Sequence, residues 1–450
     1  MKRAISIFLV LIIMLSLISG CGGSKSEDTQ EPSESTKEET STEEASEKPA
    51  DLKWDGYELS KGLEGKITFM HWGDDYERQM YADLIEAYEE LVPGVEVEQM
   101  YTPGDYYTKL QTLAASGTLP DVFWLNEARV KEFSDAGLVA DLTDVLEKYP
   151  AIAEGMFDGA LEYGQADGIQ YAIPKDFTSY VMYINVDLFE EAGIPIPTSD
   201  WTMDDYIELA EKLTIVENGR TVQYGTAVNN YRADWINFMG NYDAEWFKDG
   251  KSNISDPNAI KGLSVPATLV EKGYAPAPGT TGESEDRLFI IGQVAMYPSG
   301  RWVVPSFLAE CDFEWTAVEF PKGTTRVCPF ITANVAISAH TENKEIAANF
   351  LSFLMSETGL SYTLASGLSV PLYENLITNK NILGEPAEAF IATSKYIGDK
   401  EQIEALATGK WAEYDAIISA ELSLVFEGSQ TIEEAARNID KKANETLFND

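Results

Sequence analysis

Polar and aromatic side chains follow two predicted strands near the start of the chain. The apolar segments KITFMHW (66–72) and PDVFWL (120–125) each have the pattern of a short buried strand. In α/β sheets, functional side chains collect beyond the carboxyl ends of the strands. We therefore expect one crevice to gather Trp72, Asp74, Asp75, Asn126 and Glu127. Trp72 could instead cap the core, and Asp74 could cap the next helix.

A second set of candidates lies in the later part of the chain. Trp302 follows Ser299-Gly300-Arg301 directly after the apolar strand VAMY, so it begins a helix at a strand end. The other candidates are Asp176, Trp235, Arg301 and Trp411. For Asp176, ligand contact and satisfaction of hinge backbone N–H groups are both open, with ligand contact favoured. Trp235 suits a helix core as well as a ligand face.

Aromatic faces and carboxylates together suit the recognition of a polyhydroxylated ligand. A sugar offers flat C–H patches, which stack on aromatic rings, and hydroxyl groups, which carboxylates, amides or arginine bind. The chain has nine tryptophans, and 11% of its residues are aromatic. Arg301 could grip a carboxylate or sulfate on such a ligand, or pair with one of the 75 acidic residues.

No sequence motif selects a catalytic group. The chain has no nucleophile elbow, P-loop, HExxH or CxxC pattern, and only His71 and His340 could supply imidazole. Acidic residues are abundant enough for a glycosidase pair, which needs two carboxyls about 5 to 10 Å apart, but no spacing singles one out. We expect a binding protein that is not an enzyme and has no cofactor or metal.

Strand and helix patterns alternate along the first part of the chain. The segment Tyr76 to Leu91 has helical spacing, VEVEQMY (95–101) alternates like a strand, and a helix is predicted over Asp105 to Ala115. A further helix is predicted over Glu127 to Ala136. This alternation predicts an α/β fold.

Five segments in order carry a family resemblance over nearly all of residues 62–450. They are YTPGDYYTKLQTLAASGTLPDVFWLN, YAIP, MYINVDLFEEAG with WTMDDYIELAEKLT, GQVAMYPSGRW, and NFLSFLMSETG. Together they resemble the extracellular solute-binding proteins of ABC importers, in the carbohydrate group that includes maltodextrin-binding protein.

The resemblance implies a periplasmic-binding-protein-like fold, in which two α/β lobes joined by chain crossings hold a ligand in the cleft between them. We expect lobe one to comprise residues 62–175 and 332–367, and lobe two to comprise 177–330 and 370–450. Two sequential domains would not explain a buried strand at Ile331 to Ile337 followed by a helix from Lys344 to Met355.

The resemblance also implies a function. A sugar or oligosaccharide would bind in the cleft, the lobes would close about a hinge, and a membrane permease would recognise the closed form. The family's stacking position falls on Trp302, and an aromatic near Trp411 often lies over the sugar. A noncarbohydrate solute, such as a polyamine or glycerol phosphate, and an exported glycan-degrading enzyme are the alternatives.

The N-terminus has the pattern of a lipoprotein export signal. Lys2 and Arg3 precede a mostly apolar run that is too short to span a membrane, and Ile18-Ser19-Gly20 before Cys21 resembles a bacterial lipobox. We expect cleavage after residue 20 and a lipid such as palmitate on Cys21. Residues 22–50 are polar and acidic without an aromatic or branched aliphatic residue, which predicts a disordered tether.

Charge and cysteine content restrict the partners. A formal net charge of −42 makes nucleic acid an improbable partner and repels anionic lipid, so lipid on Cys21 should supply the attachment to the membrane. We expect a monomer on the outer face of the membrane, in a Gram-positive bacterium. A disulfide between Cys311 and Cys328 is left open.

Overall fold

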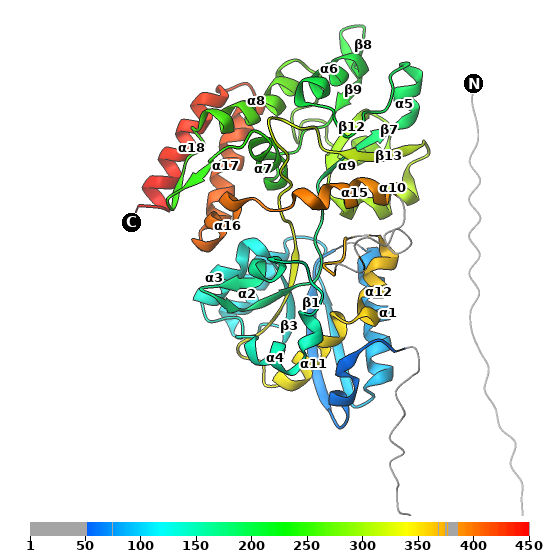
Figure 1. The fold of residues 1–450 in the computed structure, drawn as a ribbon, viewed down its shortest axis with the longest axis vertical. Coiled ribbons are helices and arrows are strands. Elements are labelled where there is room, and N and C mark those ends of the chain that lie inside the picture. Colours follow the sequence, from blue (N-terminus) through cyan, green and yellow to red (C-terminus); the bar gives the residue numbers. More distant parts are fainter. Residues whose placement is uncertain (1–51, 74, 368, 374–375, 377–385, 450) are drawn as a thin grey trace, which may run out of the picture. The chain divides into compact units, whose positions relative to one another are not determined.

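The computed structural model describes residues 52–449, apart from 74, 368, 374–375 and 377–385. All of these residues belong to one compact unit, Lys48–Asp450. It contains two five-stranded sheets, each with its own helices, and the chain passes between them (Figure 1). No helix in the described ranges has both the length and the apolar character needed to cross a membrane.

The first sheet has the strand order β2-β1-β3-β14-β6. Strand β1 pairs in parallel with β2 and β3, whereas β14 pairs antiparallel with β3 and β6. The strands are β1 (Gly65–His71), β2 (Val95–Tyr101), β3 (Val122–Asn126), β6 (Ala172–Pro174) and β14 (Ala333–Ile337). Strand β14 thus joins a sheet whose other strands lie far earlier in the sequence.

Helices and one core cluster cover this sheet, and together they form lobe one. The helices are α1 (Asp75–Leu91), α2 (Tyr106–Ser116), α3 (Val130–Asp135), α4 (Thr143–Lys148), α11 (Lys344–Leu354) and α12 (Glu357–Ser366). Helix α1 buries Met80, Leu84 and Tyr88, which are spaced four residues apart and so lie on one face of the helix. The predicted helix over Glu127 to Ala136 is divided, because the 3-10 turn η2 (Glu127–Arg129) precedes α3.

The second sheet has the strand order β13-β7-β12-β9-β8. Its strands are β7 (Val181–Asn185), β8 (Ile215–Glu217), β9 (Arg220–Thr226), β12 (Val294–Ser299) and β13 (Trp315–Glu319). All five residues of β7 are buried, and its four apolar residues alternate between two core clusters. Met182 and Ile184 join one cluster, and Val181 and Tyr183 join the other, because successive strand side chains point to opposite faces.

The helices around the second sheet complete lobe two. They are α5 (Val186–Glu191), α6 (Met203–Leu213), α7 (Arg232–Gly240), α8 (Pro257–Glu271), α9 (Glu285–Ile290), α10 (Val304–Glu310), α15 (Ala387–Thr393), α16 (Lys400–Ala407), α17 (Trp411–Phe426) and α18 (Ile432–Thr446). The predicted cap Thr202 forms a capping box with Asp205 at the start of α6. Two short hairpins, β4 (Gln165–Ala166) with β5 (Ile169–Gln170) and β10 (Phe247–Lys248) with β11 (Lys251–Ser252), lie outside the large sheets.

Where the chain passes between the lobes, hydrogen bonds join the passing segments. The Thr332 hydroxyl donates to the Asp176 carbonyl at 2.6 Å, and the Thr178 N–H donates to the Ile331 carbonyl at 3.0 Å. Phe177 and Val370 exchange backbone hydrogen bonds of 3.0 and 2.9 Å. Three segments far apart in sequence are therefore held side by side.

The cysteines in the described part of the chain are both free thiols. Cys328 is buried, and its sulfur accepts a hydrogen bond from the Tyr180 N–H at 3.2 Å. Cys311 is only partly buried. The disulfide left open by the sequence is therefore not formed.

Candidate functional site

A cavity of about 580 Å³ lies between the two lobes, and the passing segments form part of its wall. Lobe one and the first passing segment contribute Trp72, Glu77, Tyr81, Tyr107, Trp124, Asn126, Lys175 and Asp176. Lobe two contributes Tyr180, Asn229, Asn230, Tyr231, Arg232, Glu285, Tyr297, Ser299 and Trp302. Further lining residues are Phe177, Thr178, Ile331, Thr332, Ala333, Thr363 and Ser369. The volume is within the range of small-molecule sites.

The wall from lobe one is aromatic. The Trp72 ring lies edge-on to Trp124 with ring centroids 4.9 Å apart, and it also contacts Tyr106 and Tyr107. The Tyr107 oxygen accepts a hydrogen bond from the Asn126 N–H at 2.9 Å, so its own hydrogen remains available to a ligand. Burial raises the pKa of Tyr107 above its ordinary value, which keeps that hydrogen in place at neutral pH.

The facing wall from lobe two contains Trp302, whose side chain is 37% exposed. Its ring lies 6.2 Å from Tyr180 and 6.1 Å from Tyr231 between centroids. A Cβ atom at residue 300 would come within 2.1 Å of the indole, so only glycine allows this placement. The sequence Gly300-Arg301-Trp302 thus presents a large ring at the cavity surface.

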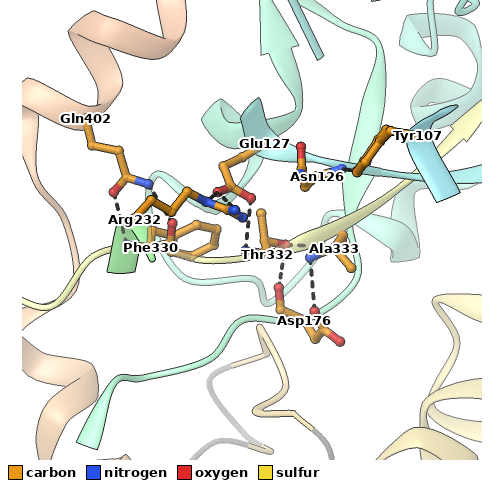
Figure 2. Close-up of polar contacts among 9 residues, drawn as sticks. All are labelled: Tyr107, Asn126, Glu127, Asp176, Arg232, Phe330, Thr332, Ala333 and Gln402. Carbon is orange, nitrogen blue, oxygen red and sulfur yellow. Dashed lines mark hydrogen bonds and ion pairs between the residues drawn. The ribbon is translucent and has the colours of Figure 1, made fainter. Parts of the chain in front are cut away.

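Lys175 and Asp176 lie where the first segment leaves lobe one. Their side chains form an ion pair, and the Lys175 ammonium lies 4.5 Å from the centroid of the Trp124 ring. One Asp176 carboxylate oxygen accepts a hydrogen bond from the Ala333 N–H at 3.3 Å (Figure 2). Asp176 therefore lines the cavity and also holds two passing segments together. Ligand contact and hydrogen bonding to the backbone between the lobes are thus compatible roles for this residue.

Glu127 lies behind the cavity wall and binds Arg232. Its Oε1 is 3.2 Å from the Arg232 Nε and 3.1 Å from Nη2, and its Oε2 accepts from the Thr332 N–H at 3.4 Å (Figure 2). Glu127 is not among the residues that line the cavity, whereas Arg232 is. The predicted ligand contact at Glu127 is thus corrected, because its carboxylate is directed at an arginine from the other lobe.

Several buried polar atoms of the cavity wall have no hydrogen-bond partner in the described protein. They are Trp124 Nε1, Asn126 Oδ1 and Asn230 Oδ1. The Asn230 amide nitrogen already donates to the Ser419 carbonyl at 2.7 Å, which fixes its oxygen as an acceptor. One donor and two acceptors are thus buried behind the cavity surface, out of direct reach of a ligand in this arrangement of the side chains.

A buried acid supports the wall formed by Tyr180. The Tyr180 hydroxyl donates to Asp234 at 2.6 Å, and the Asn229 amide nitrogen donates to the other carboxylate oxygen at 3.2 Å. Burial raises the pKa of Asp234 to about 8, although both hydrogen bonds oppose this rise. The tyrosine and the asparagine are therefore oriented from behind while they line the cavity.

The structure brings four of the predicted site residues to the cavity: Trp72, Asn126, Asp176 and Trp302. Asp75 begins α1 with a side chain that is 88% exposed and contacts Arg78, so it does not line the cavity. Asp74 lies outside the described residues. The expectation that every polar residue after the first strand faces one crevice is corrected.

Trp235 and Trp411 are also corrected. Their side chains are 2% and 1% exposed in the core of lobe two, with ring centroids 5.7 Å apart, and both rings contact Trp246. Helices α7 and α17 bury these faces in the same core cluster, which removes the tryptophans from the cavity wall. Arg301, also predicted, does not line the cavity: it is 1% exposed, and its guanidinium lies 4.9 Å from the Phe390 ring centroid.

Some lining residues were not predicted although the sequence carries a signal for them. Trp124 precedes Asn126 by two residues in a strand, so both side chains lie on one face. Asn229 and Asn230 are polar neighbours of Trp235 in NNYRADW. For Lys175, Tyr180 and Glu285, no local pattern indicates a cavity position.

Comparison with known proteins assigns this arrangement to a family. The family model for bacterial extracellular solute-binding proteins matches residues 73–360. The chain belongs to this family. Its members are binding proteins, and the family assignment places this solute-binding protein outside the cytoplasm as a component of an ABC importer.

Similar proteins are known from several bacteria. The galactooligosaccharide-binding protein of Bacillus subtilis is 24% identical over 399 residues, which cover 84% of this chain and 89% of that protein. An ABC substrate-binding protein of Listeria monocytogenes, solved with cycloalternan, has 25% identity and a TM-score of 0.76 over 86% of this chain and 100% of that chain. The GacH receptor of Streptomyces glaucescens has 20% identity and a TM-score of 0.75 over 86% of this chain and 99% of its own, which shows the shared fold.

Proposed function

We propose that this solute-binding protein binds a neutral sugar or oligosaccharide between its two lobes and delivers it to the permease of an ABC importer. The observation that carries the proposal is a cavity with tryptophans on both walls, Trp72 and Trp302, and with polar lining residues such as Tyr107, Asn126 and Asn229. The oligosaccharides in the names of the Bacillus and Listeria proteins support the same ligand class.

The charges of the cavity disfavour an anionic ligand, because Glu77, Asp176 and Glu285 line it beside Lys175 and Arg232. Both cationic side chains among its described lining residues are paired with carboxylates of the same chain, Lys175 with Asp176 and Arg232 with Glu127. A phosphate or carboxylate ligand would compete with those carboxylates for each cation. Glycerol phosphate is therefore less compatible with this cavity than an uncharged sugar.

We propose reversible closure of the lobes about the passing segments as the mechanism. A ligand that contacts both walls binds the closed form more tightly than the open form. It therefore shifts the equilibrium towards the closed form by the difference between the two binding free energies. The lobe limits 62–175 with 332–367 and 177–330 with 370–450 remain our prediction. Support comes from the pairing of β6 and β14 in one sheet and of β7 and β13 in the other.

Attachment through Cys21 is also part of the proposal. The lipobox-like sequence before Cys21 supports export and lipidation, and the acidic segment 22–50 would act as the tether. We further propose a monomer without catalytic activity and a Gram-positive source. Detergent phase partitioning of the full chain and of Cys21→Ser tests the anchor: the variant should leave the detergent phase.

A binding screen tests the ligand class. The full chain is titrated by thermal shift with malto- and galactooligosaccharides, and with spermidine, glycerol phosphate and amino acids as controls. A sugar at 100 times its dissociation constant should add about 2.7 kcal/mol of stability and raise Tm by several degrees. A shift with spermidine or glycerol phosphate and none with any sugar would overturn the carbohydrate assignment. Release of shorter sugars during the incubation would contradict a purely binding role.

A further inference from the structure

Glu127 and Arg232 connect the two lobes across the edge of the cavity. Glu127 lies in η2, directly after strand β3 of lobe one, and Arg232 is the first residue of α7 in lobe two. Their side chains approach to 3.1 Å although the residues are 105 positions apart. Figure 2 shows the two side chains meeting beside the segment that carries Thr332.

The pair is buried. The Glu127 side chain is 0% exposed and the Arg232 side chain is 12% exposed. The other Glu127 oxygen accepts from the Thr332 N–H, and the Thr332 hydroxyl in turn donates to the Asp176 carbonyl. One carboxylate therefore contacts lobe two and a segment that passes between the lobes.

The surroundings of the pair come from both lobes. Ala128, next to Glu127, joins the core cluster of lobe two, and η2 contacts α17. The Arg232 guanidinium lies 4.9 Å from the centroid of the Tyr231 ring, and the charges of Asp415 and Arg129 lie nearby. This edge of the cavity is thus a place where the lobes contact each other directly.

We infer that Glu127 is a positioning residue for ligand binding: it holds Arg232 in the cavity wall and favours the closed arrangement of the lobes. The inference rests on the proposed binding function, but it concerns a contact within the protein. Separation of the lobes would part Arg232 from Glu127, and water would then solvate both charges. Closure without Glu127 would instead bury Arg232 without its partner, which is costly.

A test measures closure without any ligand. Fluorescent dyes are attached through unnatural amino acids at Ala115 on α2 and Glu413 on α17, both of which are exposed. Single-molecule energy transfer is compared in the full-length wild type, Glu127→Gln, Arg232→Gln and the double variant. The control is Glu345→Gln, which removes an exposed ion pair with Lys148 inside lobe one. Thermal melting establishes that each variant is folded.

We expect each single variant to lower the closed population at least fivefold. The closed population of the double variant should lie closer to that of the wild type, because neither Glu127 nor Arg232 then buries its charge without the other. Glu345→Gln should leave the closed population unchanged. Equal closed populations in the wild type, Glu127→Gln and Arg232→Gln would overturn the inference. The inference would also be overturned if the double variant and Arg232→Gln had the same closed population.

The malto- and galactooligosaccharides of the screen provide an independent measurement. The affinity lost in Glu127→Gln should match the factor by which the closed population falls, because apparent affinity scales with the competent fraction. If no sugar binds while the change in closure persists, the proposed function fails and the role of Glu127 stands. If a sugar binds Glu127→Gln and the wild type equally, the role of Glu127 fails and the function stands.

Discussion

At the level of single residues, the cavity depends on a few side chains that other residues hold in place. Gly300 permits the approach of Trp302, Asn126 orients the Tyr107 hydroxyl, and Asp234 orients Tyr180. None of these supporting contacts requires a ligand. The walls are therefore preorganised, which lowers the entropy lost on binding.

Replacement of Trp302 should weaken sugar binding strongly. We expect Trp302→Ala to lower affinity about tenfold or more, because a stacking contact contributes about 0.5 to 1.5 kcal/mol in addition to the buried area. Isothermal titration with a sugar found in the screen measures the change. Trp302→Phe should retain part of the affinity, and Ile215→Ala, at an exposed position on the edge strand β8, should retain all of it. Unchanged binding by Trp302→Ala would exclude this residue from the site.

Asp234 should make the stability of the protein depend on pH. Its pKa is raised to about 8 by burial, against an ordinary value of about 4. The folded protein retains this proton between those values whereas the unfolded chain releases it. The contribution of Asp234 to stability is therefore full below about pH 4 and is lost as the pH rises through about 8.

Chemical unfolding at several pH values tests this prediction. The free energy of unfolding of the wild type, relative to Asp234→Asn, should fall by about 1 kcal/mol per pH unit between about pH 5 and 7. Asp75→Asn, at a side chain that is 88% exposed, is the matched control. Parallel profiles for the wild type and Asp234→Asn would contradict the raised pKa.

At the level of elements, helix α16 contributes to holding the segments between the lobes. The Gln402 side chain accepts from the Phe330 N–H at 3.2 Å and donates to the Phe330 carbonyl at 2.8 Å (Figure 2). The Phe330 ring stacks on Tyr163 with centroids 3.9 Å apart. A single glutamine thus satisfies both backbone groups of a buried residue beside the cavity.

Loss of this glutamine should destabilise the fold. Gln402→Ala leaves a buried donor and a buried acceptor unsatisfied, and each costs about 1 to 3 kcal/mol, so we expect a loss of about 2 kcal/mol or more. Urea unfolding measures the change. Gln111→Ala on α2, at an exposed position, should change stability by less than about 0.5 kcal/mol. Equal stability of Gln402→Ala and Gln111→Ala would show that the two contacts to Phe330 contribute nothing.

At the level of the whole molecule, the dominant property is a net charge of −42. Charge of one sign favours solubility but repels itself in the compact state. Ion pairs such as Lys53–Glu357 and Lys148–Glu345 lie at exposed sites and offset little of this repulsion. A surface of this charge is repelled by anionic lipid.

Salt should stabilise this protein. Raising sodium chloride from about 0.02 to about 0.2 M shortens the screening length from roughly 20 Å to below 10 Å, so we expect Tm to rise by a few degrees. Differential scanning calorimetry of the full chain measures the shift. Sucrose, which does not screen charge, is compared at equal osmolality. A fall of Tm with salt would mean that favourable ion pairs outweigh the self-repulsion.

Local sequence determined much of the fold and part of the site. Helix α1, strand β2 and the capping box at Thr202 follow from residue periodicity and from contacts within a few residues, which no distant segment has to supply. Family motifs extended this to the two-lobed fold. Trp302 and Asn126 line the cavity, and both could be placed at its edge from the sequence because each follows a predicted strand end.

The tertiary structure alone decided which candidate side chains face the cavity. Trp235 and Trp411 have polar neighbours in sequence, yet helices α7 and α17 turn them into one core. Glu127 meets Arg232, and Asp176 meets Thr332 and Ala333, across 105 to 157 residues of chain. Periodicity specifies one face of one element, whereas these contacts depend on how two lobes pack, which no local pattern encodes.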